Sequence, residues 1–484
     1  MSPPDGTVAV AKPAAGCHGG TDTMQQAARA AGKSALLDRL ATDYPKGPHD
    51  QPQSMCPAFG ALRVGLRMRR VATILSGSAC CVYGLTFTSH FYGARRSVGY
   101  VPFDSETLVT GQLFEDIRKA VRETARPADY DAVVIINLCV PTASGVPLDL
   151  LPKEIDGVRI IGIDVPGFGV PTHAEAKDVL AGAMLRYART EAEAEAGAVA
   201  RPRTELADGQ RVTLLGELFP ADPPGVAAML APMGLAIGPQ LPAREWRDLY
   251  AALDCSIAAA VHPFYTASVR EFAAAGRAVV GSAPVGEAAT ADWLDAIGRA
   301  ANIDAVTIDR AKAQALAPIR AVMAANPVNA RMVVSGYEGS ELLVARLLIE
   351  AGATIPYVGT ALPRTEWSDA DRIWLEEQGT HVQYRASLEQ DIAAMREVKP
   401  DLALGTTPLV QAAKEIGTPA VYFTNMVSAR PVFGAAGAAA LPAIVAAQCK
   451  GRERFSRMVG FFEAAPAPTP PPRIVTRPVK AEVV

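Results

Sequence analysis

The sequence has no hydrophobic run long enough to cross a membrane. A membrane-spanning helix needs about 18 or more consecutive apolar residues, and no stretch of the 484 residues reaches this length. An apolar signal core is also missing near the N-terminus. We therefore expect a cytoplasmic protein without a membrane span.

An excess of positive charge is likewise missing. The 47 Lys and Arg residues are balanced by 50 Asp and Glu residues, which gives a net charge of −3. Proteins that bind nucleic acid usually carry basic surfaces that neutralise phosphates. The composition therefore predicts no nucleic-acid partner.

Several catalytic signatures are absent. There is no GxxxxGK[ST] phosphate loop, no HExxH zinc motif and no GxSxG nucleophile turn. The segment PGFGVP at 166–171 has a G-x-G pair but lacks the third glycine of a dinucleotide fingerprint. We therefore expect no ATP hydrolysis, zinc-protease chemistry or dinucleotide binding from this chain.

Paired cysteine patterns are missing too. The seven cysteines are an odd number, and none of them forms a Cys-x-x-Cys pair. A long chain without an export signal is not expected to carry a disulfide framework. Its thiols are therefore free either to pack as small apolar side chains or to bind a metal.

What the sequence does contain is a series of continuous apolar runs. The run at 71–75 (VATIL) and the run within 131–141 (DAVVIINLCVP) are typical of strands that are buried on both faces of a parallel sheet. Between them, Leu113, Ile117 and Val121 predict a helix over 112–124. Alternating strands and helices of this kind predict an α/β fold with parallel sheets.

The alternation restarts twice along the chain. A polar break at 200–210 precedes the second series, and MVVSG at 332–336 opens a third. We expect an α/β protein of three similar domains, 51–203, 204–303 and 304–448, between a poorly ordered arm, 1–50, and a Pro-rich C-terminal segment, 449–484.

Three cysteines stand where a ligand site of the first domain is expected. Cys81 follows the first strand and Cys139 ends the second apolar run, and ligands gather beyond the carboxyl ends of parallel strands. Cys56 lies upstream in MCPAFG, where Pro57 and Gly60 are expected to keep the backbone open. Placement alone is equally compatible with ordinary buried thiols.

The remaining cysteines are expected to have other roles. Neighbouring side chains on an extended backbone point in opposite directions, so one member of the pair Cys80 and Cys81 is expected to pack. We expect structural roles for Cys17, Cys255 and Cys449.

The order of several segments resembles the nitrogenase-like component-one proteins. The resemblance is carried by CPAFGALRVGLRMRRVATILSGSACCVYGLTFTSHFYG, then NLCVP, DVPGFGVPTHAEAKD, SAPVGEAATADWLDAIG and VVSGYEGSELLVARLLIEAG, and it extends from about 53 to 448. It implies three Rossmann-like domains and an α2β2 assembly with a homologous second subunit. It also implies a separate iron–sulfur reductase dimer that hydrolyses ATP and delivers electrons.

The same resemblance implies a cofactor and its ligands. The cluster cysteines of the family match Cys56, Cys81 and Cys139, which implies a [4Fe-4S] cluster at the subunit interface with its fourth ligand from the partner. Family members that fix nitrogen carry a further cysteine in the second domain. Here the matching stretch contains His262 and no cysteine nearby, which favours the tetrapyrrole reductases of the family.

A tetrapyrrole reductase would use the cluster to reduce the C7=C8 double bond of a chlorin B ring. Its flat substrate would need a wide apolar crevice, for which residues 258–264 and the aromatics Phe87, Phe91 and Tyr92 are candidates. The sequence assigns no proton donor. Two alternatives remain open: an N-type subunit of a light-independent protochlorophyllide reductase, and a non-catalytic cluster scaffold.

Overall fold

The computed structural model describes residues 52–91, 98–195, 211–216, 222–428 and 430–451, together with 455, 457 and 459. The expected N-terminal arm, nearly all of the Pro-rich segment, and Cys17 lie outside these residues. So do Tyr92 and the side chain of Phe91.

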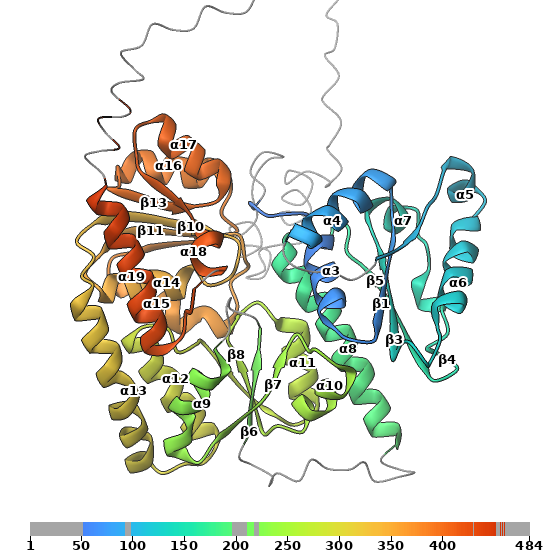
Figure 1. Cartoon of the computed structure of the whole chain (residues 1–484), viewed down its shortest axis with the longest axis horizontal. Coiled ribbons are helices and arrows are strands. Elements are labelled where there is room, and N and C mark those ends of the chain that lie inside the picture. The colour runs from blue at the N-terminus through green and yellow to red at the C-terminus, as the bar shows by residue number, and fades with distance from the viewer. Residues whose placement is uncertain are drawn as a thin grey trace, which may run out of the picture.

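The described residues form three lobes, each built on its own sheet (Figure 1). The first sheet has the order β2-β1-β3-β5-β4 and the second has the order β7-β6-β8-β9. The third has the order β12-β11-β10-β13-β14. All strand pairs are parallel except β4 with β5, so the predicted α/β class with three parallel sheets is confirmed.

The strands are short, as is usual for doubly covered sheets. Those of the first sheet are β1 (Val71–Ser76), β2 (Gly99–Val101), β3 (Ala132–Asn137), β4 (Glu154–Ile155) and β5 (Val158–Asp164). Those of the second are β6 (Arg211–Leu215), β7 (Ala236–Leu241), β8 (Ile257–Ala260) and β9 (Ala278–Gly281). Those of the third are β10 (Arg331–Gly336), β11 (Thr354–Thr360), β12 (His381–Tyr384), β13 (Leu402–Gly405) and β14 (Ala420–Tyr422).

Helices connect the parallel strands and cover the sheets. In the first lobe they are α3 (Pro57–Arg67), α4 (Ala79–Phe91), α5 (Ser105–Val109), α6 (Gln112–Thr124), α7 (Cys139–Ala143) and α8 (His173–Glu195). In the second they are α9 (Pro223–Leu230), α10 (Trp246–Leu253), α11 (Thr266–Ala274) and α12 (Glu287–Ala300). The others are α13 (Ala305–Ala325), α14 (Glu341–Glu350), α15 (Asp369–Glu377), α16 (Leu388–Val398), α17 (Thr407–Glu415), α18 (Phe423–Ser428) and α19 (Gly434–Lys450).

Burial on both faces explains the strands that the apolar runs predict. Every residue of β1 and of β3 is buried, so neither strand shows a polar face. The helix predicted over 112–124 is α6, and its buried residues are Leu113, Ile117 and Val121. Here the sequence pattern and the packed face agree because one helix side meets the sheet.

One local expectation is wrong. The backbone after Cys56 is not open: Pro57 is the first residue of α3, where its missing N–H costs no hydrogen bond. Gly60 lies inside this helix. Only glycine fits at this position, because a Cβ there would be 1.7 Å from the carbonyl oxygen of His173 in α8. The two helices thus pack with their backbones in direct contact.

Two cores join neighbouring lobes. One cluster of buried side chains runs from Val212 of the second sheet to Val445 of α19 in the third lobe. Another joins α3 and α8 of the first lobe to α10 and α11 of the second. Arg385 adds a contact between the third and first lobes, because its guanidinium donates to both oxygens of Glu175 at 2.6 and 2.7 Å.

Glu341, at the start of α14, is a fully buried carboxyl that makes stability depend on pH. It accepts hydrogen bonds from the Glu338 and Gly339 backbone and from Thr360, yet burial raises its pKa to about 7. Folding then favours the protonated form, so stability is greatest below the unfolded pKa near 4.5 and falls as pH rises to 7.

We expect this single carboxyl group to lower the free energy of unfolding by about 3 kcal/mol as the pH rises from 4.5 to 7. The urea midpoint of the Glu341→Gln variant should therefore fall less with rising pH than that of the unchanged chain. The same change at the exposed Glu377 serves as the control and should leave the pH dependence as it is. If the urea midpoints of the two variants fell equally with rising pH, the pH dependence would not come from Glu341.

Candidate functional site

The candidate site lies at the carboxyl edge of the first sheet. The central strands β1, β3 and β5 end side by side, with Ser76 paired to Asn137 and Asn137 to Asp164. Short turns then lead into α4 and α7, and α3 lies beside α4 (Figure 1). This edge is where a parallel sheet exposes its ligand-binding loops.

All three predicted cysteines stand at helix starts on this edge. Cys56 is the N-cap of α3, Cys81 lies in the first turn of α4, and Cys139 is the first residue of α7. The N-terminal ends of α3 and α4 carry partial positive charge, which favours a thiolate there. At Cys56 this effect is opposed by burial, which raises the pKa of the thiol.

The three thiols face a common region. Burial raises the pKa of Cys56, and the nearby thiols of Cys139 and Cys81 raise it further, while the backbone N–H groups of Ala58 and Phe59 oppose the shift. This electrostatic contact brings together residues that are far apart in the sequence. All three are nevertheless exposed on the surface of the single chain.

Hydrogen bonds to sulfur complete the site. The Gly167 N–H donates to Cys139 Sγ at 3.1 Å, and the Ser78 hydroxyl donates to Cys81 Sγ at 3.2 Å. Ser78 also lies 3.2 Å from Cys80 Sγ, and this hydrogen bond lowers the pKa of Cys80. Such donors stabilise negative charge on cluster sulfurs.

The donor chemistry at this edge is of the kind that an iron–sulfur cluster uses. Within the described residues, no three His, Cys, Asp or Glu side chains are grouped closely enough to hold one ion. Thiolates that bind different corners of a cluster lie farther apart than thiolates that bind one ion. Three converging cysteines with N–H and O–H donors are therefore the donor set that a cluster uses.

The pair Cys80 and Cys81 differs from expectation in its backbone. Both residues lie on a helix and not on an extended segment. Successive helical side chains are about 100° apart around the axis, so the two thiols still point in different directions. The thiol of Cys81 is among the groups that raise the pKa of Cys56.

Cys255 and Cys449 lie away from this edge. Cys255 is buried, donates to the Ala251 carbonyl oxygen at 3.3 Å, and has its pKa raised to about 11 by burial. Cys449, near the end of α19, is partly buried against the core of the second and third lobes.

Exposed apolar side chains surround the candidate site. Tyr83 and Phe87 on α4 stack with ring centres 6.4 Å apart and are 75% and 63% exposed. Val140 follows Cys139, and Phe168 follows the hydrogen-bond donor Gly167; both are also exposed. Phe87, a candidate for lining a pocket, thus lies on the surface of this single chain.

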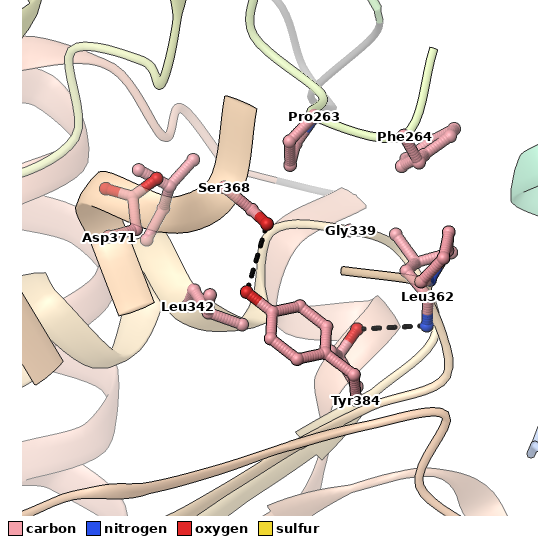
Figure 2. Close-up of a pocket in the computed structure, with 11 residues that line it drawn as sticks. Pro263, Phe264, Gly339, Leu342, Leu362, Ser368, Asp371 and Tyr384 are labelled. Atoms are coloured by element: carbon pink, nitrogen blue, oxygen red, sulfur yellow. Dashed lines mark hydrogen bonds between the residues drawn. The ribbon is translucent and has the colours of Figure 1, made fainter. Parts of the chain in front are cut away.

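The crevice expected near residues 258–264 does not form within the described chain. Ala258, Ala259 and Ala260 are fully buried, and His262 packs against Phe264 and Tyr265. Figure 2 shows Pro263 and Phe264 closing over Leu342 and Tyr384 of the third lobe.

The cavity left there is about 20 Å³, and the Ser368 hydroxyl lies 3.0 Å from the Tyr384 hydroxyl beside it (Figure 2). Such a volume holds about one water molecule, whereas ligand pockets measure hundreds of Å³. At this position the described residues of the single chain therefore leave only a small cavity, and the wide crevice stays a prediction for the assembled complex.

Sequence reasoning missed Ser78 and Gly167. Ser78 stands three residues before Cys81 in a helix-start position, a signal that could have identified it. Gly167 contributes its backbone N–H from a segment 28 residues away from Cys139, which no local pattern reveals.

Comparison with known proteins agrees with this geometry. The family model described as "Nitrogenase component 1 type Oxidoreductase" matches residues 56–449. The chain is 64% identical over 462 residues to the "Chlorophyllide reductase 52.5 kDa chain" of Cereibacter sphaeroides, covering 96% of this chain and 91% of that one. Its counterpart in Rhodobacter capsulatus is also 64% identical, over 93% and 90% of the two chains.

Solved structures share the fold at much lower identity. Nitrogenase Cp1 at pH 6.5 superposes with a TM-score of 0.64 at 16% identity, covering 88% of this chain and 96% of that one. Nitrogenase Cp1 at pH 5 gives a TM-score of 0.64 at 12% identity, covering 88% and 92%. No helix among the described residues combines the length and hydrophobicity required to span a bilayer. The family match, which includes all three candidate cysteines, shows that this chain belongs to the nitrogenase component 1 type oxidoreductases.

Proposed function

We propose that the chain is the Y subunit of chlorophyllide a reductase, an oxidoreductase of bacteriochlorophyll synthesis. The observation that carries this proposal is 64% identity to chlorophyllide reductase chains over more than nine-tenths of this chain. The low-identity structural matches support only the fold. The reaction reduces the C7=C8 double bond of the chlorin B ring.

The cofactor is a [4Fe-4S] cluster held by Cys56, Cys81 and Cys139. When bound, the cluster supplies one-electron transfer at low potential. The Gly167 N–H and the Ser78 hydroxyl stabilise the charge on the Cys139 and Cys81 sulfurs. The helix start at Cys56 directs the Ala58 and Phe59 N–H groups toward the third sulfur.

The fourth ligand comes from the homologous Z subunit in an α2β2 heterotetramer. In support, the three thiols are exposed in the single chain, and Tyr83, Phe87, Val140 and Phe168 form an exposed apolar margin around them. A partner surface on this margin would exclude water from the cluster. Chlorophyllide a binds in the assembled complex, since the described chain alone offers no crevice at 258–264.

Electrons come from a separate iron–sulfur reductase dimer, the X subunit, which hydrolyses ATP. The absence of a phosphate loop from this sequence supports that division. We place the complex in the cytoplasm, with no membrane span and no nucleic-acid partner. The three sheets then correspond to domains I, II and III with boundaries near 203 and 303.

The test is conversion of chlorophyllide a by the reconstituted Y, Z and X subunits with ATP and a low-potential donor. We expect the chlorin absorption to move to that of a bacteriochlorin, and little change with protochlorophyllide. Efficient turnover of protochlorophyllide alone would instead identify an N-type subunit. A scaffold would convert neither pigment and would transfer its cluster to another protein.

A further inference from the structure

The segment that leads into Cys56 is held by the third lobe. We call residues 52–56 the connector. Pro52 forms an isolated antiparallel bridge with Ser387, and the Gln53 N–H donates to the Ala386 carbonyl oxygen at 3.4 Å. Residues 386 and 387 lie between β12 and α16 of the third lobe. The connector therefore begins on a different sheet from the one that carries the candidate cluster site.

The Gln53 side chain strengthens this attachment. Its Nε2 donates to Asp391 Oδ2 at 2.5 Å, and its Oε1 accepts a hydrogen bond from the Thr406 hydroxyl. Asp391 is 1% exposed and also accepts from Ser335 at 2.5 Å and Tyr357 at 2.8 Å. The amide thus joins a buried network at the ends of the third-sheet strands, where losing a partner is costly.

The next residue is fixed to the first lobe. Ser54 Oγ accepts a hydrogen bond from the His173 N–H at 2.9 Å and lies 3.2 Å from His173 Nδ1. His173 is the first residue of α8, which packs against α3 through the close contact at Gly60. Consecutive connector residues are therefore anchored to two different lobes.

Only two residues separate Ser54 from the start of α3 at Pro57, and Cys56 is one of them. Cys56 lies three residues after Gln53 and two after Ser54, so these two anchors together limit where the Cys56 backbone can lie. We infer that Gln53 is a positioning residue for the Cys56 thiol, and that it makes the cluster geometry depend on how the third lobe packs against the first. The inference deepens the proposed function and rests on it for the ligand role of Cys56.

The test compares the assembled complex with its Gln53→Ala variant. Hydrogen–deuterium exchange of the peptide covering 52–58 should become about fivefold to tenfold faster, as expected when one or two hydrogen bonds are lost. The g-values of the reduced-state EPR signal should shift while the iron content is retained, because the thiolate moves but remains present. A contact that serves stability alone would leave the g-values unchanged.

Two further variants make the comparison specific. Gln411→Ala removes an exposed Gln–Glu hydrogen bond on α17 of the same lobe and should change neither the exchange nor the EPR signal. The double variant Gln53→Glu/Asp391→Asn exchanges the donor and acceptor roles of the pair. It should restore much of the original signal, which keeps the test informative if Gln53→Ala folds poorly.

The outcomes separate this inference from the proposed function. Unchanged exchange in Gln53→Ala, or faster exchange with an unaltered EPR signal, would overturn the positioning role. If the unmodified complex binds no iron, the proposed cluster fails. In that cluster-free complex, the rate of Cys56 alkylation relative to that of Cys139 should still differ between Gln53→Ala and the unmodified chain. An unchanged ratio of the two rates would overturn the positioning of the Cys56 thiol by Gln53.

Discussion

Replacing Cys81 with alanine is expected to abolish the proposed [4Fe-4S] cluster of the assembled complex. The thiols of Cys81 and Cys139 both raise the pKa of Cys56, which supports the proposal that the three sulfurs serve one site. Removal of any one would leave an iron without its protein ligand and open to solvent. Iron analysis and the reduced-state EPR signal measure the loss, which Cys56→Ala and Cys139→Ala should reproduce.

The neighbouring cysteine provides a matched control. Cys80→Ala removes a thiol one position away on the same helix, and it should leave the iron content unchanged. Cys255→Ser and Cys449→Ser should also retain the cluster, since neither residue lies at the sheet edge. Full iron content in Cys81→Ala, together with its loss in Cys80→Ala, would reverse the assignment within the pair.

Replacing Gly60 with alanine is expected to destabilise the chain strongly. The added Cβ would lie 1.7 Å from the His173 carbonyl oxygen and 2.7 Å from its carbon, both of which are backbone atoms. Neither α3 nor α8 could avoid this clash by a side-chain rotation, so the helices would have to separate. We expect a loss of more than about 3 kcal/mol, at the upper end of the range for overpacking.

The midpoint of urea unfolding and the yield of folded protein measure this effect. Gly84→Ala is the matched control, because Gly84 lies on the exposed side of α4 with no atom within 4 Å of an added Cβ. Alanine should stabilise that helix by about 1 kcal/mol. If Gly60→Ala unfolded at the same urea concentration as Gly84→Ala, the direct contact between the α3 and α8 backbones would be refuted.

The sequence predicted the strands of the first sheet because their burial is uniform. Val71–Ser76 and Ala132–Asn137 are buried along their whole length, so a continuous apolar run is the only pattern they can show. The helix over 112–124 was equally predictable, since one face alone is buried. These elements are determined by contacts that a local pattern records.

Other features depend on partners far along the chain. Pro57 and Gly60 look like helix breakers in isolation, yet the packing of α8 makes a glycine necessary inside α3. The residues of the candidate site also divide into those that a local sequence pattern or the family resemblance indicates and those that depend on distant contacts. Cys81 and Cys139 follow apolar runs and Cys56 is indicated by the family resemblance, whereas the Gly167 donor and the Gln53 connection arise only when distant segments meet.

The connector also constrains when the site can be completed during synthesis. Gln53 is made early, but Asp391 and Thr406 follow it by 338 and 353 residues. At about 5–20 residues per second, a ribosome needs tens of seconds to make that length. For most of that interval the Gln53 contacts with the third lobe are missing, although the first sheet and the Ser54 contact with His173 can already form. The final position of Cys56 at the proposed cluster site is therefore expected only after translation of the third lobe.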